Sequence, residues 1–293
     1  MAITYNNLYL DIRQQLRRAG IDGATLEARE LVCFGTGKTR EELSRDGGLY
    51  AAPETEQRVR ALVARHLAGE PVAYLIGEWE FYGLPLDISR DVLIPRPDTE
   101  VLAGLAIEYV RSLGECRVLD LCAGSGCIGL AVAAQAREAR VVLGEQSDAA
   151  LKICRQNIRR NGLSGRVVPV QAGALEKPER SLGEFSCIVC NPPYIPHGDI
   201  AGLDPSVRDY EPHLALDGGP DGLDFYRAVS EKWKQALTVG GRLYFEVGIG
   251  QADSVLRLMR AQGFGDIQVV KDLHGIPRVV FGTLCAEVYG QTI

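Results

Sequence analysis

Two segments of the sequence carry residues whose types and spacing could do chemistry. The first is DLCAGSGCIG, Asp120 to Gly129, in which three glycines are spaced as Gly-x-Gly-x-x-Gly between an apolar run and a helical pattern. Glycines let the backbone approach a ligand closely, and Glu145, about 20 residues farther on, could hold the two hydroxyls of a ribose. The spacing therefore predicts a site for a nucleotide or a nucleoside, and NAD must be considered.

Asp120 discriminates between the two main ligands of such a loop. A dinucleotide would bring its pyrophosphate to the N-terminus of the following helix, and a carboxylate beside that anion would repel it. S-adenosylmethionine has no phosphate, and its α-ammonium and sulfonium groups are cationic. Asp120 therefore favours S-adenosylmethionine over NAD.

The second segment is CNPPYIP, Cys190 to Pro196, which follows an apolar, β-branched run. Open α/β sheets bind ligands at the carboxyl ends of their strands, so Asn191 is expected at such an end. The side-chain carbonyl of Asn191 and the backbone carbonyl of Pro192 can each accept a hydrogen bond from one hydrogen of an NH2 group. Pro192 and Pro193 hold these acceptors in place because their φ angles are fixed, and Tyr194 can offer a flat face to a planar acceptor.

This arrangement suits methylation of an amide or an exocyclic amine, whose nitrogen is a weak nucleophile because its lone pair is delocalised. Two acceptors on its hydrogens favour pyramidalisation as charge develops, which stabilises the transition state and keeps the nitrogen in line with the methyl group. No general base is needed first, because the methylated nitrogen is acidic enough to lose a proton afterwards. We therefore predict Asn191, Pro192 and Tyr194 as catalytic residues and Asn191 to Tyr194 as the substrate-binding segment.

Four segments together resemble the HemK/PrmC family, the peptide chain release factor glutamine N5-methyltransferases. They are DLCAGSGCIG, CNPPYIP, PVAYLIGEWEFYGLPLDISRDVLIPRPDTE and YEPHLALDGGPDGLDFYR, and the resemblance covers nearly the whole chain. NPPY is shared with adenine methyltransferases, whereas LIPRPDTE between a hairpin and the glycine loop is more telling. The resemblance implies methyl transfer from S-adenosyl-L-methionine to the side-chain amide nitrogen, N5, of a glutamine in peptide chain release factors.

The resemblance also implies how the site is divided. The cofactor loop falls on Cys122 to Gly126, and a helical N-terminal domain is implied to dock the release factor. The chain departs from the family where Gly173 and Ala174 replace the Asp and bulky residue often found near the adenine, and where Glu145 replaces a common Asp. The full set of predicted cofactor-binding residues is Asp120, Cys122, Ala123, Gly124, Ser125, Gly126, Glu145, Ala174 and Asn191.

Three regions of the chain must position these residues. Residues 1–77 have helical periodicity, and residues 78–97 have a two-residue alternation that is broken by Gly and Pro, which predicts a linking β-hairpin. Residues 98–293 begin with a helix that Asp98 and Thr99 are expected to cap, and strands and helices then alternate. This rhythm predicts an α/β fold with a doubly wound, mostly parallel seven-stranded sheet, Rossmann-like and of the class I methyltransferase type. The last two strands have no helix between them and should form an antiparallel hairpin.

Composition excludes several other classes of protein. The 293 residues are 46% hydrophobic and 24% charged, with a net charge of -6 and a pI near 5.4, so no basic field indicates a nucleic acid or membrane partner. No apolar run approaches the ~20 residues that span a bilayer, and the charged first 20 residues do not form a signal peptide. Eight cysteines without such a signal predict reduced thiols in a cytoplasmic protein. We expect no metal site at Cys187 and Cys190, because residues three apart on a strand point to opposite faces and cannot share a metal. We also expect a monomer.

Two alternative substrates remain, a DNA or RNA adenine methylated at N6 and a glutamine of a ribosomal protein. NPPY would hold an exocyclic amine equally well, but an adenine enzyme must unstack the base and hold a phosphate backbone with Lys and Arg. Residues 1–85 would have to provide those cations, and they contain ten Lys and Arg against twelve Asp and Glu, a net of -2. A non-enzymatic adaptor is disfavoured because Asp120, Glu145 and Asn191 are all chemically competent.

Overall fold

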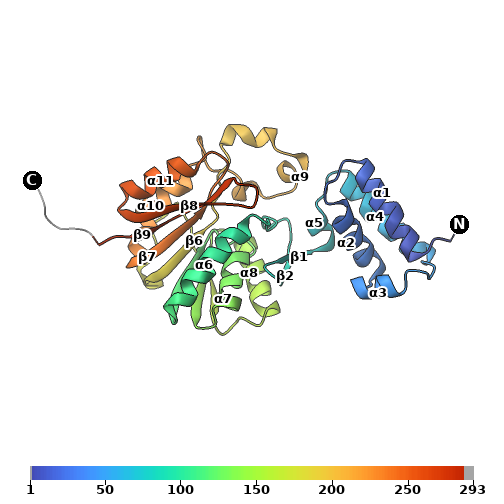
Figure 1. Cartoon of the computed structure of the whole chain (residues 1–293), viewed down its shortest axis with the longest axis horizontal. Coiled ribbons are helices and arrows are strands. Elements are labelled where there is room, and N and C mark those ends of the chain that lie inside the picture. The colour runs from blue at the N-terminus through green and yellow to red at the C-terminus, as the bar shows by residue number, and fades with distance from the viewer. Residues whose placement is uncertain (1, 287–293) are drawn as a thin grey trace, which may run out of the picture. The chain divides into compact units, whose positions relative to one another are not determined.

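The structure, a computed structural model, describes residues 2–286 and divides into two compact units (Figure 1). Unit 1 comprises the described residues up to 78 together with 204–210. Unit 2 comprises residues 79–203 and the described residues from 211 onward. The hairpin therefore groups with unit 2, and residues 204–210 group with unit 1. The predicted domain boundaries at residues 77 and 97 stay predictions.

Unit 1 is helical, as its periodicity predicts. Leu8, Ile12 and Leu16, which recur every four residues, are fully buried, since this spacing places them on one face of the first helix. That helix packs against the second and fourth helices. The helices of the unit are α1 (Tyr5–Arg18), α2 (Ala24–Thr36), α3 (Arg40–Arg45), α4 (Pro53–Leu67), α5 (Val72–Ile76) and α9 (Pro205–Arg208).

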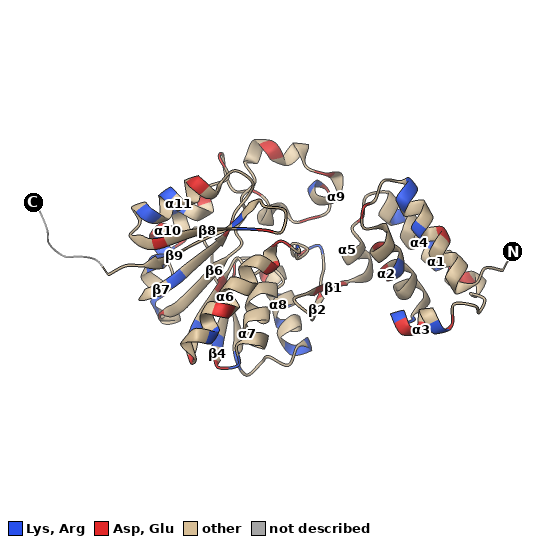
Figure 2. Cartoon of the chain, viewed as in Figure 1, with Lys and Arg blue, Asp and Glu red and all other residues tan. Residues whose placement is uncertain are grey.

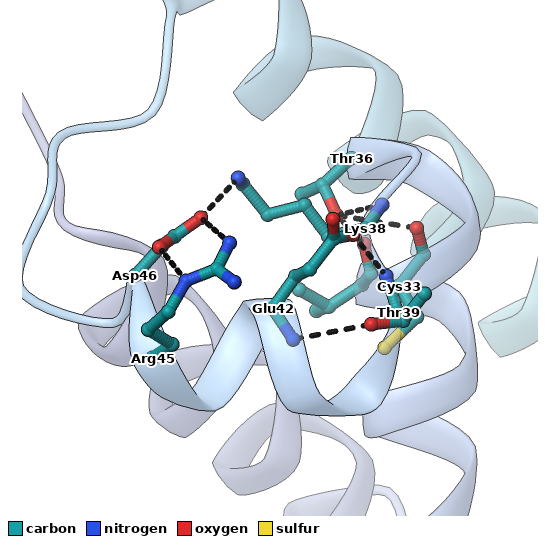
Figure 3. A network of polar contacts seen from close by, with 8 residues as sticks. Cys33, Thr36, Lys38, Thr39, Glu42, Arg45 and Asp46 are labelled. Carbon is teal, nitrogen blue, oxygen red and sulfur yellow. Dashed lines mark hydrogen bonds and ion pairs between the residues drawn. The ribbon is translucent and has the colours of Figure 1, made fainter.

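Helix α3 is short and is fixed by polar contacts at both ends (Figure 3). The Oγ1 atom of Thr39 accepts a hydrogen bond of 3.1 Å from the Glu42 backbone N–H, and the Glu42 carboxylate accepts one of 2.9 Å from the Thr39 N–H. This is a capping box. At the other end Asp46 accepts from Arg45 and Lys38 at 2.9 and 2.8 Å, and these donors lower the pKa of Asp46 to about 2.

The predicted hairpin forms from β1 (Glu78–Phe81) and β2 (Leu84–Asp87). Its two-residue turn places Tyr82 and Gly83 at φ 52° and 75°, the left-handed region that such turns require. The end of β2 is attached to α8 (Asp148–Arg160). The Asp87 N–H donates to Oδ1 of Asn157 at 2.6 Å, and Arg160 pairs with the Asp87 carboxylate at 2.5 Å.

Seven strands form the predicted sheet in the order β5-β4-β3-β6-β7-β9-β8. Strands β3 to β7 are parallel, and β9 is antiparallel to both β7 and β8. The predicted mostly parallel sheet and its antiparallel closing hairpin are therefore confirmed, with β9 inserted next to β7. The strands are β3 (Cys116–Leu121), β4 (Ala139–Glu145), β5 (Val167–Gln171), β6 (Phe185–Cys190), β7 (Leu237–Glu246), β8 (Phe264–Lys271) and β9 (Pro277–Leu284).

Helices cover both faces of this sheet, with α6 and α7 packed together on one face and α10 and α11 on the other (Figure 1). Because both faces are covered, the central strands are apolar throughout: four consecutive residues of β6, from Cys187 to Cys190, are buried. Trp233 and Tyr226 fill the core on the α10 side. The remaining elements of unit 2 are α6 (Thr99–Leu113), α7 (Cys127–Gln135), α10 (Asp224–Lys232), α11 (Ala252–Ala261) and the 3-10 turns η1 (Arg180–Leu182), η2 (His197–Gly202), η3 (His213–Ala215) and η4 (Trp233–Ala236).

Asp98 occupies the predicted N-cap position of α6, but the predicted capping by its side chain and by Thr99 is wrong. Asp98 precedes the helix but makes no side-chain capping hydrogen bond, and Thr99 is the first helical residue. A tertiary partner takes the Asp98 carboxylate instead, because Arg278 of β9 lies 3.0 Å from its Oδ2 atom. Among residues 2–286, no helix is both long and apolar enough to cross a membrane.

Candidate active site

The loop between β3 and α7 has a backbone shaped by three left-handed residues. Cys122 has φ 63° although it is not a glycine, and Gly124 and Gly126 have φ 56° and 82°. A Cβ atom at Gly124 would meet nothing within 4 Å, whereas Ala123 and Ser125 are buried. The loop therefore exposes the backbone of Gly124, and the left-handed Cys122 is a form of strain that concentrates at functional sites.

Glu145 lies beside this loop because its strand is the neighbour of β3. The pairing of Leu121 with Gly144 places Glu145 level with the start of the loop. One oxygen of its carboxylate accepts from the Gly124 N–H at 2.9 Å, and the other accepts from the Ser147 N–H at 2.8 Å. The structure thus brings the predicted ribose carboxylate and the predicted loop together.

Asp120 is fully buried under the same loop. Its Oδ2 atom accepts a hydrogen bond of 2.7 Å from the N–H of Gly129, in the first turn of α7, and its Oδ1 atom is buried without a partner. Burial raises the pKa of Asp120 to about 7, the bond from Gly129 opposes this rise, and the charge of Glu145 adds to it. The carboxyl therefore has one oxygen engaged with the helix and one available for a cation.

Two residues of α8 hold the glycine loop through hydrogen bonds to its backbone carbonyls. The sequence reasoning missed both. The side-chain amide of Asn157 donates to the Ser125 carbonyl at 2.9 Å, and the Cys154 thiol donates to the Gly124 carbonyl at 3.1 Å. Asn157 is fully buried. A polar residue on the apolar face of an amphipathic helix was the signal that could have identified it.

The segment Asn191 to Tyr194 leaves β6, the other neighbour of β3. Pro192 and Pro193 are buried, while Asn191 and Tyr194 are half-buried. The Asn191 amide lies 3.5 Å from the hydroxyl of Thr99, which is itself buried. Burial raises the pKa of Tyr194 to about 12, so its phenol stays neutral at any ordinary pH.

Residues 216–222 belong to one of the four family segments but had no assigned role, and Gln251 was not singled out from the sequence; both hold this segment. Ile195 exchanges backbone hydrogen bonds with Leu216 and Gly218, and Nε2 of Gln251 donates to the Tyr194 carbonyl at 2.8 Å. A Cβ atom at Gly218 would lie 2.7 Å from the Tyr194 Cα atom. The glycines of LDGGPDG therefore permit close backbone packing, which is the signal that the sequence carried.

Ala174, the predicted adenine contact, follows β5 and packs in the core beside Trp233. It is 3% exposed, and its carbonyl accepts a hydrogen bond of 3.1 Å from the Trp233 indole. The neighbouring Gly173 is half-buried, and a Cβ atom there would lie 3.6 Å from the carboxyl carbon of Glu176. The contact of Ala174 with a cofactor stays a prediction.

The cysteines of unit 2 near the site are thiols. The Sγ atoms of Cys122 and Cys190 lie 3.9 Å apart, and both Cys187 and Cys190 are buried, which raises their pKa values. Burial in the sheet therefore keeps Cys187 and Cys190 protonated.

One cluster in the described part of the chain has the residue types of a metal site, namely Asp98, Asp272 and His274. Arg278 lies 3.0 and 3.2 Å from the two carboxylates of this cluster. The guanidinium supplies the positive charge that a metal would otherwise bring.

Polar atoms without partners gather at the carboxyl edge of the parallel strands. Six buried side-chain nitrogen or oxygen atoms lack a hydrogen-bond partner among the described residues, and four of them lie at this edge: Asp120 Oδ1, Ser125 Oγ, Glu246 Oε2 and Arg278 Nε. Native proteins seldom leave such atoms unsatisfied. This edge therefore has the donors and acceptors that a polar ligand would satisfy.

Comparison with known proteins decides the family. The family model described as "PrmC N-terminal domain" matches residues 7–77, and "Methyltransferase small domain" matches residues 103–202. A release factor glutamine methyltransferase of Geobacter sulfurreducens is 42% identical over 274 residues, covering 93% of this chain and 94% of the relative. The chain belongs to the release factor glutamine methyltransferase family.

A second member of the family, from Thermodesulfovibrio yellowstonii, is 36% identical and covers 87% of this chain and 90% of its own. Membership confirms the family assignment made from the four sequence segments. It also makes this chain an enzyme of the methyltransferase class, which uses S-adenosylmethionine.

Solved structures agree in fold. The catalytic domain of hMettl16, solved in complex with the MAT2A 3'UTR hairpin 6, is 17% identical, with a TM-score of 0.55 over 78% of this chain and 84% of that one. A methyltransferase from Pyrococcus furiosus is 17% identical, with a TM-score of 0.52 over 76% of this chain and 98% of that one. At this identity they confirm the predicted class I methyltransferase fold of the sheet.

Proposed function

We propose that this chain transfers a methyl group from S-adenosyl-L-methionine to the side-chain amide nitrogen, N5, of a glutamine in peptide chain release factors. The observation that carries the proposal is the placement of Asn191 to Tyr194 directly after β6, beside the strand that leads into the glycine loop. A planar amide and a methyl donor would then meet at one edge of one sheet. The names of the relatives supply the substrate class.

The residues of the glycine loop fit the cofactor by charge and by space. Asp120 has a buried, unpartnered oxygen for a cationic group, and Gly124 leaves room for close backbone approach. Glu145 would hold the ribose, while Cys122, Ala123, Ser125 and Gly126 complete the loop. When bound, S-adenosylmethionine supplies an electrophilic methyl group on sulfur.

The residues after β6 would act on the acceptor. The Asn191 side-chain carbonyl and the Pro192 backbone carbonyl would accept from the two hydrogens of the glutamine amide, which keeps its nitrogen lone pair directed at the methyl group. Pro193 and the neutral phenol of Tyr194 would pack against the planar amide. The nitrogen would form a bond to the methyl carbon as the carbon–sulfur bond breaks, and it would then release a proton to solvent.

The charge distribution supports a protein substrate over a nucleic acid. Figure 2 shows Lys and Arg interspersed with Asp and Glu on helices α1 to α4, and residues 1–85 carry a net charge of -2. Binding to a phosphate backbone needs a concentrated positive surface. An adenine of DNA or RNA and a glutamine of a ribosomal protein are the alternatives that the assay must separate.

The test offers purified release factor, ribosomal proteins, and unmethylated DNA and RNA in parallel, each with labelled methyl donor. We expect label in the release factor, and mass spectrometry of its peptides should place one methyl group on a glutamine. Label in nucleic acid or in a ribosomal protein, with the release factor unmodified, would overturn the proposal. Titration calorimetry with S-adenosylmethionine and with NAD tests the cofactor separately.

The remaining features of the proposal concern the setting in which the enzyme works. A release factor is the proposed partner, with no membrane, no metal and no direct nucleic acid substrate. We propose a cytoplasmic monomer, in keeping with the free thiols of the described cysteines. Light scattering of the purified protein checks the oligomeric state.

A further inference from the structure

Glu246 ends β7 beside the segment that carries Asn191, and the sequence reasoning assigned it no role. Strands β6 and β7 are parallel, and Cys190 pairs with Phe245 as the last matched residues. Glu246 is the last residue of β7 and Asn191 is the first residue after β6, so each follows this pair by one position and the register brings them next to each other. The register of β6 with β7 therefore places Glu246 next to Asn191.

The Glu246 side chain is 2% exposed, although it carries a carboxyl group. The Asn191 Nδ2 atom lies 3.5 Å from the Thr99 hydroxyl, and the donors of both residues lower the pKa of the Glu246 carboxyl, whose Oε2 atom is buried without a partner. Arg278 acts on it through its charge but forms its ion pairs with Asp98 and Asp272. A carboxyl in this environment costs free energy, and such costs persist where the group has a task.

The task follows from hydrogen-bond chemistry. The side-chain amide of Asn191 has an NH2 end and a carbonyl end, and the two could exchange places by rotation about one bond. A hydroxyl such as that of Thr99 can face either end, since it both donates and accepts, but an ionised carboxylate only accepts. In its ionised form Glu246 therefore selects the orientation in which the NH2 end of Asn191 faces the protein and its carbonyl end faces away.

We propose that Glu246 is a positioning residue that fixes the Asn191 amide, so that its carbonyl oxygen is presented to the NH2 group of the acceptor. Thr99 completes the arrangement from the first turn of α6. This inference rests on the proposed function, because it assigns the Asn191 carbonyl to the acceptor. In the opposite orientation Asn191 would present NH2 to NH2, and the acceptor nitrogen would lose one of its two hydrogen-bond partners.

Burial raises the pKa of Glu246 to about 7, while donation from Thr99, the charge of Arg278 and donation from Asn191 oppose the rise and the charge of Asp98 adds to it. A neutral glutamine at position 246 can accept or donate. Replacing Glu246 therefore removes the enforced choice of orientation and leaves the shape of the site nearly unchanged.

The decisive experiment exchanges the donor and the acceptor between the two positions. Asn191→Asp places two carboxyl groups face to face, and turnover should fall about 10²-fold, as for the loss of one aligned partner of the transition state. Glu246→Gln should lower kcat about tenfold, the effect typical of a supporting partner.

When the two substitutions are combined, the amide introduced at position 246 can donate to the carboxylate introduced at position 191, whose other oxygen still faces the acceptor. The kcat of this double variant should exceed that of Asn191→Asp by about tenfold or more, a non-additive rescue.

A double variant no faster than Asn191→Asp would overturn the inference, because a merely structural role gives losses that multiply. KM for the release factor and the dissociation constant of S-adenosylmethionine should stay within about twofold of wild type in Glu246→Gln, since kcat alone depends on this orientation. Ser230→Ala, which removes a buried and unpartnered hydroxyl from α10, is the matched control and should leave kcat unchanged.

A readout without any substrate separates this inference from the proposed function. In thermal unfolding, the double variant should be more stable than the sum of the two single shifts in melting temperature predicts, which reports direct coupling of the pair. Non-additive shifts in melting temperature, together with the rescue of kcat, support the inference, and additive shifts overturn it.

If the wild-type enzyme methylates no release factor, the proposed function fails, while the melting temperatures still test the contact between residues 191 and 246. If Asn191→Asp does not fold, a wild-type kcat in Glu246→Gln overturns the inference.

Discussion

Gln251 donates a hydrogen bond of 2.8 Å from its Nε2 atom to the backbone carbonyl of Tyr194. Its Oε1 atom accepts from the Gly248 N–H at 3.0 Å, so one side chain ties the segment after β6 to the turn after β7. The same Nε2 atom lies 3.3 Å from the Gly222 carbonyl. The proposed acceptor-binding segment is therefore held in place by two other loops as well as by its own prolines.

The packing of Gly222 against Tyr194 predicts a loss of activity in Gly222→Ala. Gly222 has φ 72°, and a Cβ atom there would collide with the Tyr194 carbonyl oxygen. We expect kcat/KM to fall at least tenfold, roughly 1.4 kcal/mol, because small displacements in catalytic geometry are costly. Steady-state kinetics with the release factor provide the measurement.

Gly250→Ala is the matched control for this variant. Gly250 has φ 83°, equally left-handed, but a Cβ atom there meets nothing within 4 Å. It should lose about 1 kcal/mol of stability from backbone strain and keep its activity. Equal losses of activity in the two glycine variants would show that strain, and not the contact with Tyr194, is responsible.

Asn191→Ala should act on the chemical step. The variant loses the side-chain carbonyl that we assign to the acceptor amide, so turnover should fall about 10²-fold or more. The affinity for S-adenosylmethionine, measured by calorimetry, should change much less. Normal turnover together with poor cofactor binding would contradict the assigned role.

Asp120 predicts that cofactor binding depends on pH. The pKa of its carboxyl is raised to about 7 by burial, so the group is largely protonated below pH 7 and ionised above it. A cationic ligand favours the ionised form. The affinity for S-adenosylmethionine should therefore rise by up to about tenfold per pH unit as pH increases toward 7, and then level off.

Asp120→Asn removes this titration while keeping an oxygen for the Gly129 N–H. It should bind S-adenosylmethionine about 1–3 kcal/mol more weakly at pH 8, because a buried cation loses its charged partner, and its affinity should no longer rise between pH 6 and pH 8. An unchanged pH profile in the variant would show that another group titrates.

His66 predicts a second pH effect, on the stability of unit 1. Burial disfavours the charged ring, but hydrogen bonds to the Glu27 carboxylate at 2.7 Å and to the Glu70 carbonyl outweigh it, so the pKa of His66 is raised. A raised histidine pKa stabilises the folded state below the unfolded pKa of 6.5, and this contribution is lost as pH rises through the folded pKa. Glu27→Gln should therefore lower stability at pH 6 by up to about 1 kcal/mol, and by less at pH 9.

Urea unfolding at the two pH values checks this prediction. Glu30→Gln is the control, since Glu30 lies on the same helix and pairs at 2.7 Å with Arg40, which is charged at both pH values. The effect of Glu30→Gln should not depend on pH. A Glu27→Gln effect of equal size at pH 6 and pH 9 would exclude His66 as its source.

The sequence by itself determined the family and the order of the elements. Alternating apolar runs and helical periods specified the doubly wound sheet, because burial on both faces requires strands such as Cys187–Cys190 to be apolar throughout. Glycine spacing specified the loop after β3, since few other residues adopt its left-handed angles. The distance of about 20 residues from the glycine loop singled out Glu145 as a carboxylate for a ribose.

Only the tertiary structure decided which polar groups support the site. Asp98 could have capped α6 on local grounds, but Arg278, distant in sequence, takes its carboxylate. Glu246 resembles an ordinary polar residue at a strand end, and Gln251 one at the start of a helix, until folding brings them near Asn191 and Tyr194. These contacts join residues that are distant in the sequence, and no local periodicity encodes them, because periodicity reports which face of an element is buried and not which partner meets it there.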